Sequence, residues 1–239
     1  MAKTVIHKAN TRGQADHGWL KSFHTFSFAN YHNPERIHFG ALRVLNDDTV
    51  AAGKGFGRHP HDNMEIISIP LEGDLEHADS MGNKSVIRYG DIQAMSAGTG
   101  ITHSEYNAND NKPVKFLQIW VFPNRRNIQP RYSQVTLNAE DRKNKWNVIV
   151  SPQSNDNGGV TIQQDAWFSL ADIGQGKQLS YAVRQKDNGV YVFVLKGAVT
   201  IGDQKLGNRD GIGIWETDQI TISADNDAEI LLMDVPMSI

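Results

Sequence analysis

The sequence predicts an all-β protein that is built from two β domains. Short segments rich in Val, Ile, Phe and Tyr, at 116–122, 190–195, 220–223 and 229–235, lie between closely spaced turn residues. Many short strands separated by regular turns are typical of a sandwich or a barrel, and they argue against βαβ units. A length of 239 residues is enough for two domains that each bury a core of their own.

Turn residues recur along the whole chain, and they set the expected limits of the strands. The turn signals are Asn46-Asp47-Asp48, Glu72-Gly73-Asp74, Met81-Gly82-Asn83, Asn157-Gly158-Gly159, Asn188-Gly189, Lys196-Gly197 and Gly202-Asp203. One helical signal occurs, at residues 138–143, where Asn138 is expected to cap a short helix. The segment 123–130 holds two prolines without alternation, and we interpret it as the connection between the domains. Similar turn spacing before and after this segment favours a duplicated β domain.

Composition excludes several classes of function. The 24 basic and 27 acidic side chains are spread evenly, which predicts no binding of nucleic acid or of an anionic membrane. The absence of cysteine excludes disulfides, thiolate metal sites and a cysteine nucleophile. The first residues have no apolar signal core, and no apolar run approaches the ~18 residues of a membrane helix. We therefore expect a cytoplasmic protein.

Histidine is distributed unevenly along the chain. All nine histidines lie at or before position 103, and the remaining 136 residues contain none. This distribution predicts that histidine chemistry is confined to the first half.

Two short clusters in that half have the spacing of metal ligands. The first is His59-Pro60-His61, and the second is His103-Ser104-Glu105. In a strand, side chains at i and i+2 point to the same face, about 6.6 Å apart along the chain. If the two strands meet, these four side chains converge on one ion. Imidazole and carboxylate ligands suit a divalent first-row metal, and four ligands leave up to two positions open for catalysis.

Other residues compete for these roles. Glu65 has the strand parity of His61 but lies about 13 Å further along an extended chain. It remains an alternative ligand if the chain bends, or a residue that orients a ligand histidine. The other six histidines have no ligand-like partner at short spacing, and we predict surface or structural roles for them: His7, His17, His24, His32, His38 and His77.

The same clusters resemble the signatures of cupins. Residues 53–65 read G-x5-H-x-H-x3-E, and residues 90–107 approximate the second cupin motif, with Ser96 where many cupins have proline. More closely, the chain resembles the pirin family of bicupins. The matching stretches are GWLKSFHTFSFANY (18–31), LRVLND (42–47), GFGRHPH (55–61), LEG (71–73), DSMGN (79–83) and SAGTGITHSE (96–105), with looser agreement at 130–132 and 164–165.

This resemblance implies a bicupin, in which two antiparallel β-barrel (jelly-roll) domains lie face to face. We place a metal-binding N-terminal domain at residues 1–128 and a C-terminal domain without a metal site at residues 129–239. The implied metal ligands are His59, His61, His103 and Glu105. One divalent transition metal is expected, with Fe(II) first and Ni, Co, Mn, Cu or Zn as alternatives for the same nitrogen and oxygen ligands.

The resemblance also implies a function. Bacterial relatives of this family include quercetin 2,3-dioxygenases, which open the heterocycle of a flavonol with O2 and release carbon monoxide. We expect this activity in a monomer, with Glu105 as the catalytic residue that accepts the proton of the flavonol 3-hydroxyl. The alternative is a metal-loaded regulatory protein that acts through a protein partner, with any quercetinase activity incidental.

Overall fold

The computed structural model of the protein describes residues 2–155 and 158–238. Within these ranges it contains twenty-two β-strands and two short 3-10 helices, η1 (Ala9–Thr11) and η2 (Ala139–Arg142), and no α-helix. None of the described helices therefore has the length and apolar character needed to cross a membrane. All pairs of described strands are antiparallel except that of β13 with β14.

The first half of the chain supplies most of one barrel. Its seven-stranded sheet has the order β12 (Arg131–Thr136), β9 (Asp91–Ser96), β6 (Glu65–Glu72), β11 (Val114–Val121), β4 (Leu42–Val50), β3 (Leu20–His24) and β2 (Gly13–Asp16). Its four-stranded sheet has the order β5 (Gly55–His61), β10 (Ile101–Asn107), β7 (Asp74–Asp79) and β8 (Lys84–Arg88).

The second half repeats this arrangement. Its seven-stranded sheet has the order β1 (Lys3–His7), β20 (Gly211–Trp215), β17 (Asn188–Lys196), β22 (Ala228–Pro236), β15 (Trp167–Ile173), β13 (Asn147–Pro152) and β14 (Val160–Ile162). Its four-stranded sheet has the order β16 (Gln178–Ala182), β21 (Gln219–Ala224), β18 (Val199–Ile201) and β19 (Gln204–Leu206). The predicted pair of antiparallel β-barrels is confirmed.

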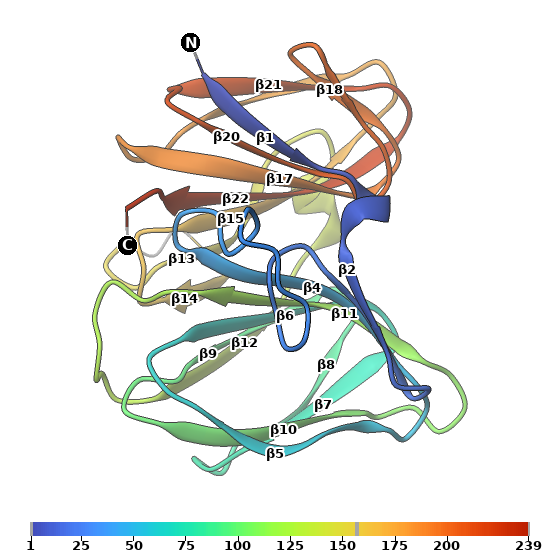
Figure 1. The fold of residues 1–239 in the computed structure, drawn as a ribbon, viewed down its shortest axis with the longest axis vertical. Coiled ribbons are helices and arrows are strands. Elements are labelled where there is room, and N and C mark those ends of the chain that lie inside the picture. Colours follow the sequence, from blue (N-terminus) through green and yellow to red (C-terminus); the bar gives the residue numbers. More distant parts are fainter. Residues whose placement is uncertain (1, 156–157, 239) are drawn as a thin grey trace.

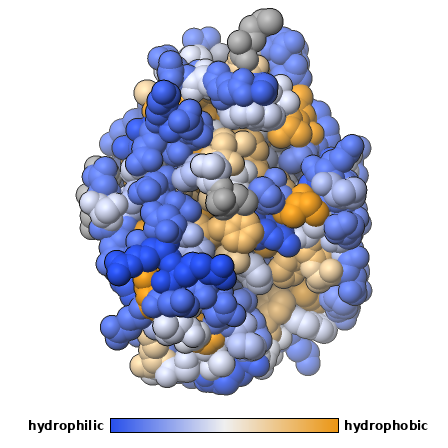
Figure 2. Space-filling model, turned by 60° about the vertical axis from the view of Figure 1, so that its left-hand side comes forward, coloured by the Kyte–Doolittle hydropathy of each residue, from blue (hydrophilic) through white to orange (hydrophobic). Residues whose placement is uncertain are grey.

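The two seven-stranded sheets face one another at the centre of the molecule, and the four-stranded sheets lie at its two ends (Figure 1). One continuous apolar core joins the barrels, with Leu45 and Leu117 from the first sheet and Phe168 and Phe193 from the second. The face of the molecule in Figure 2 is largely hydrophilic, with a band of apolar side chains down its middle. Because burial of apolar area is the main favourable term in folding, this shared core holds the barrels together.

A polar contact adds to this interface. The carboxylate of Asp47 lies 3.2 Å from Nη1 of Arg12 and 2.9 Å from Nε of Arg209, so it bridges residues from the two halves of the chain. The Arg12 side chain is only 5% exposed. This carboxylate therefore neutralises a guanidinium that burial would otherwise leave without a counter-charge.

Strands are exchanged between the two halves. β1, at the start of the chain, pairs with β20 of the second barrel, and β12 pairs with β9 of the first. The irregular segment 123–130 joins β11 to β12, which are both strands of the first barrel's seven-stranded sheet. The predicted boundary between residues 128 and 129 stays a prediction.

Two of the predicted turns are strands. Asn46, Asp47 and Asp48 lie in the middle of β4, and Asn188 and Gly189 begin β17 after a turn at 184–187. In both places pairing with neighbouring strands overrides the local preference of Asn, Asp and Gly for turns. The signal at Asn157-Gly158-Gly159 lies partly outside the described residues. The predicted cap is confirmed, because the side chain of Asn138 accepts a hydrogen bond from the backbone N–H of Glu140 at the start of η2.

Candidate metal centre

The two predicted ligand clusters lie on adjacent strands of the four-stranded sheet. β5 pairs with β10, and the register places His103 directly opposite His59. The ring centroids of His59 and His103 are 4.4 Å apart, and that of His61 is 4.9 Å from each. One ring nitrogen from each histidine lies within 4.8 Å of the others. The structure thus brings the three predicted histidines together through the pairing of β5 with β10.

Hydrogen bonds fix which ring nitrogens are free. The Nδ1 atom of His59 lies 2.7 Å from the backbone oxygen of Gly57, so Nδ1 carries the proton and Nε2 keeps its lone pair. The Nε2 atom of His103 is buried and has no hydrogen-bond partner among the described residues. A buried nitrogen without a partner is costly unless a ligand satisfies it. This nitrogen, within a group of three imidazoles, fits a divalent first-row metal ion.

Burial keeps the imidazoles of His61 and His103 neutral. Burial, together with the neighbouring His59, lowers the pKa of His61 to about 4. Burial and the nearby imidazoles lower the pKa of His103 to about 2. Near neutral pH both rings therefore keep a lone pair that a metal can accept.

Glu105 lies two residues after His103 on β10 and is buried. Its carboxylate, His77 and His103 form a second group whose ligand atoms lie within 4.8 Å of one another, so His103 belongs to both groups. The Glu105 oxygens accept hydrogen bonds from Ser68 (3.0 Å) and Gln118 (2.7 Å). Burial raises the pKa of Glu105.

His77 has a place that the sequence interpretation missed. It is fully buried, its Nδ1 lies 3.5 Å from Nδ1 of His103, and its Nε2 lies 3.2 Å from Asp79 Oδ2. Its ring stacks on Tyr132, with centroids 4.8 Å apart. His77, for which we predicted a surface or structural role, therefore contacts a predicted ligand histidine. Strand parity carried the signal, because His77 shares the inward face of β7 with buried Leu75.

The contacts of Glu65 differ from those expected of a metal ligand or of a residue that orients a ligand histidine. It is 1% exposed, and its Oε2 atom accepts hydrogen bonds from Ser96 Oγ at 2.6 Å and from the backbone N–H of Gln163 at 3.0 Å. Neither partner is a histidine. Glu65 therefore connects the start of β6 to the second half of the chain.

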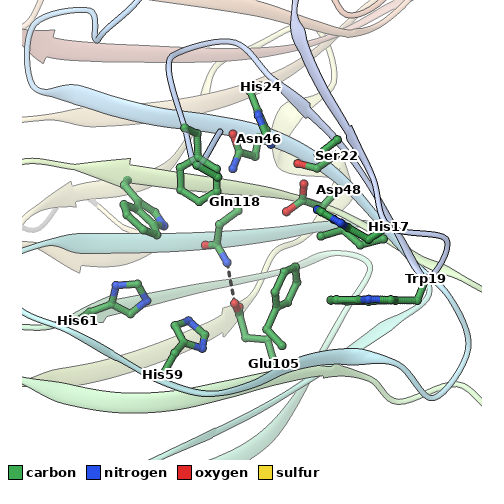
Figure 3. A pocket seen from close by; sticks show the side chains of 16 residues that line it. His17, Trp19, Ser22, His24, Asn46, Asp48, His59, His61, Glu105 and Gln118 are labelled. Atoms are coloured by element: carbon green, nitrogen blue, oxygen red, sulfur yellow. Dashed lines mark hydrogen bonds between the residues drawn. The ribbon is translucent and has the colours of Figure 1, made fainter. Parts of the chain in front are cut away.

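A cavity of about 420 Å³ opens beside the histidines (Figure 3). This volume is within the range of sites for small organic molecules. Aromatic and aliphatic walls alternate with polar groups, and the lining residues are Ala15, His17, Trp19, Leu20, Ser22, His24, Phe28, Ala29, Asn46, Asp48, Phe56, His59, His61, Glu105, Gln118 and Trp120. His17 and His24, for which we predicted surface or structural roles, therefore line the cavity, and His24 is buried.

Both halves of the chain match families of known proteins. Residues 5–121 match the Pirin family model, and residues 148–235 match the model of the quercetinase C-terminal cupin domain. A quercetin 2,3-dioxygenase of Escherichia coli K12 is 46% identical over 235 residues, covering 97% of this chain and 98% of that protein. The chain belongs to the pirin family.

Solved structures and a further relative agree with this membership. The crystal structure of the bacterial pirin YhhW of Escherichia coli in complex with nickel(II) superposes with a TM-score of 0.92 at 43% identity, covering 98% of this pirin and 99% of YhhW. A pirin-like protein of Caulobacter vibrioides is 40% identical, covering 93% of this chain and 95% of that protein. The bicupin fold predicted from the sequence is therefore that of a pirin.

Proposed function

We propose that this pirin is a metal-dependent dioxygenase that cleaves the heterocyclic ring of quercetin-like flavonols with O2 and releases carbon monoxide. The observation that carries the proposal is a group of three imidazoles, two of which line a cavity large enough for a flat aromatic substrate. The names of the quercetin 2,3-dioxygenases in the family support the choice of substrate.

We assign His59, His61, His103 and Glu105 as the residues that would hold the metal. When bound, a divalent metal supplies Lewis acidity that lowers the pKa of a hydroxyl ligand such as the flavonol 3-hydroxyl. Fe(II) remains the predicted metal, with Ni, Co, Mn, Cu and Zn as alternatives, and the nickel complex of YhhW supports a divalent ion.

The chain's own residues would prepare the substrate. Glu105 is the proposed proton acceptor, because each carboxylate oxygen accepts one hydrogen bond from Ser68 or Gln118 and retains a further lone pair. Trp19, Phe56 and Trp120 provide apolar walls that would hold a planar ring system and displace water.

The remaining expectations from the sequence stand as proposals. The partners would be the flavonol and O2, without direct nucleic-acid or membrane binding. The cytoplasmic location and the monomeric state stay predictions, and so does the alternative of a regulator that acts through a protein partner.

The decisive experiment is anaerobic reconstitution with single metals, followed by O2 and quercetin, with flavonol absorbance and carbon monoxide measured together. We expect His61→Ala and Glu105→Gln to abolish both metal retention, measured by elemental analysis, and turnover. His32→Ala, at an exposed histidine, is the matched control and should retain both. A metal-free variant that still cleaves quercetin would refute the metal dependence. Absence of turnover with every metal would overturn the proposal in favour of the regulatory alternative.

A further inference from the structure

A compact polar cluster occupies the inner wall of the first barrel, on strands that carry none of the proposed metal ligands. It consists of Ser22 and His24 on β3 and of Asn46 and Asp48 on β4. The register places Ser22 opposite Asp48 and His24 opposite Asn46, so the four side chains form one block on the cavity face. Figure 3 shows this block across the cavity from His59 and His61.

The cluster contains several buried polar atoms without a hydrogen-bond partner among the described residues. All four residues are more than nine-tenths buried. Three of their atoms, His24 Nδ1, Asn46 Oδ1 and Asp48 Oδ1, have no hydrogen-bond partner among the described residues. Such groups are rare in native proteins, because each one without a partner costs free energy. Three of them within one four-residue block indicate a place for a ligand's polar groups.

The neighbouring row of side chains connects this block to the proposed metal centre. Asn46 lies opposite Gln118 on β11, and Gln118 lies opposite Ser68 on β6. Gln118 and Ser68 are the residues that donate hydrogen bonds to Glu105. The polar surface thus extends across the barrel wall from Glu105 to His24, while Leu20 and Phe56 beside it are apolar.

The unpartnered atoms specify the chemistry of the ligand. Carboxylate and amide oxygens accept hydrogen bonds, so the cluster needs a ligand that presents donors. Among flavonols, the pendant ring of quercetin carries two adjacent hydroxyl donors. In the fused ring system the 3-hydroxyl would lie at the metal centre and the 5-hydroxyl is held by the 4-carbonyl, which leaves the 7-hydroxyl as a single free donor.

We infer that Ser22, His24, Asn46 and Asp48 form a specificity subsite that binds the adjacent hydroxyl groups of a catechol ring while the substrate's 3-hydroxyl lies at the metal centre. Asp48 is the principal acceptor. The inference rests on the proposed flavonol dioxygenase function and adds the basis of its selectivity. A site that is built to hydrogen-bond a substrate hydroxyl rejects analogues that lack this hydroxyl.

The electrostatics of Asp48 agree with this role. Burial, with smaller contributions from Asp47 and Glu105, raises the pKa of Asp48 to about 7, and the hydroxyl of Ser22 opposes that rise. Ser22 donates to this carboxyl group, but Asp48 Oδ1 has no hydrogen-bond partner among the described residues. Two phenolic hydroxyls would supply donors, and hydrogen bonds to a charged acceptor are stronger than those between neutral groups.

The test uses three flavonols that differ only in the pendant ring: quercetin with two hydroxyls, kaempferol with one and galangin with none. We expect the wild-type kcat/KM to decrease in that order. Asp48→Ala should lower kcat/KM for quercetin by about tenfold or more relative to galangin. Asp48→Asn keeps the shape and one acceptor oxygen, so it should show a smaller loss of preference. Asp110→Asn, at an exposed carboxylate outside the cavity, is the matched control and should keep the wild-type ratio.

The outcomes separate this inference from the proposed function. Turnover of all three flavonols with an unchanged quercetin-to-galangin ratio in Asp48→Ala would overturn the subsite and leave the dioxygenase proposal standing. If the wild type cleaves no flavonol, the dioxygenase proposal fails. The subsite is then tested by anaerobic binding of the same three compounds to metal-loaded protein, followed by tryptophan fluorescence. Equal loss of affinity for all three compounds in Asp48→Ala would refute it.

Discussion

Replacing Asp48 by Asn should change how the stability of this pirin depends on pH. Asp48 is 4% exposed, and its pKa is raised from 3.8 to about 7, chiefly by burial. The folded state therefore holds this proton more tightly than the unfolded state. As pH rises from about 4 to about 7, the unfolded chain ionises Asp48 while the folded chain resists, so the wild type loses stability. An asparagine does not ionise, and the variant lacks this loss.

The size of the effect follows from the two pKa values. The free energy that Asp48 subtracts from stability is about 2 kcal/mol at pH 5 and about 4 kcal/mol at pH 8. The unfolding free energy of Asp48→Asn minus that of the wild type should therefore increase by about 2–3 kcal/mol between these two pH values. Effects of the substitution that do not depend on pH, such as an altered hydrogen bond to Ser22, cancel in this comparison.

Urea denaturation of the chelator-treated proteins at half-unit steps from pH 5 to pH 8 measures this difference. Asp110→Asn provides the control for a carboxylate in an exposed position, and its stability should follow the wild type throughout. Parallel curves for Asp48→Asn and the wild type would refute the reasoning. They would mean that Asp48 already ionises near its ordinary pKa inside the barrel.

Three further perturbations test other parts of the structure. Asp47→Ala removes the carboxylate shared by two arginines at the barrel interface. Urea denaturation should show that the free energy of unfolding decreases by about 3 kcal/mol, whereas Asp110→Ala, at an exposed carboxylate, should change it little. Gly98 has φ +50°, and an added Cβ would collide with a backbone oxygen, whereas Gly53 at φ +63° has open space. Thermal unfolding should therefore show that Gly98→Ala is less stable than Gly53→Ala by at least about 1 kcal/mol. Equal unfolding midpoints for these two variants would contradict the close approach of the backbone oxygen to Gly98. A divalent metal at a hundred times its dissociation constant should stabilise the wild type by about 2.7 kcal/mol over chelated protein, and His61→Ala should show no such response.

Part of the proposed metal centre was predictable because strand parity is a local property. Side chains two residues apart share a face whatever the partner strand, so His59 and His61 had to point together, as did His103 and Glu105. The adjacency of β5 and β10 was not implied by parity, since it depends on the topology of the barrel. The sequence resemblance supplied that missing step.

The residues of the polar cluster were missed because local preference and tertiary context disagree there. Asn46 and Asp48 have side chains that favour turns, and three consecutive polar residues resemble a loop. In the structure they share the inward face of β4 with buried Val44 and Val50, while Asp47 points to the other barrel. Alternation with buried aliphatic residues on both sides was the available signal for a strand.

The two barrels differ in how their interiors are filled, and among the histidines that lie in strands only His7, on β1, belongs to the second barrel. The second barrel has the same sheet arrangement, but its interior is filled by a cluster of aliphatic side chains that includes Val192, Ile212 and Leu232. A small barrel is most stable when side chains fill it, and an unpaired polar group inside costs free energy. The first barrel keeps a cavity lined by histidines and by several buried polar atoms that have no partner among the described residues. That arrangement is unfavourable for folding alone, and in the proposed function a metal and a polar ligand would satisfy those atoms and offset their cost.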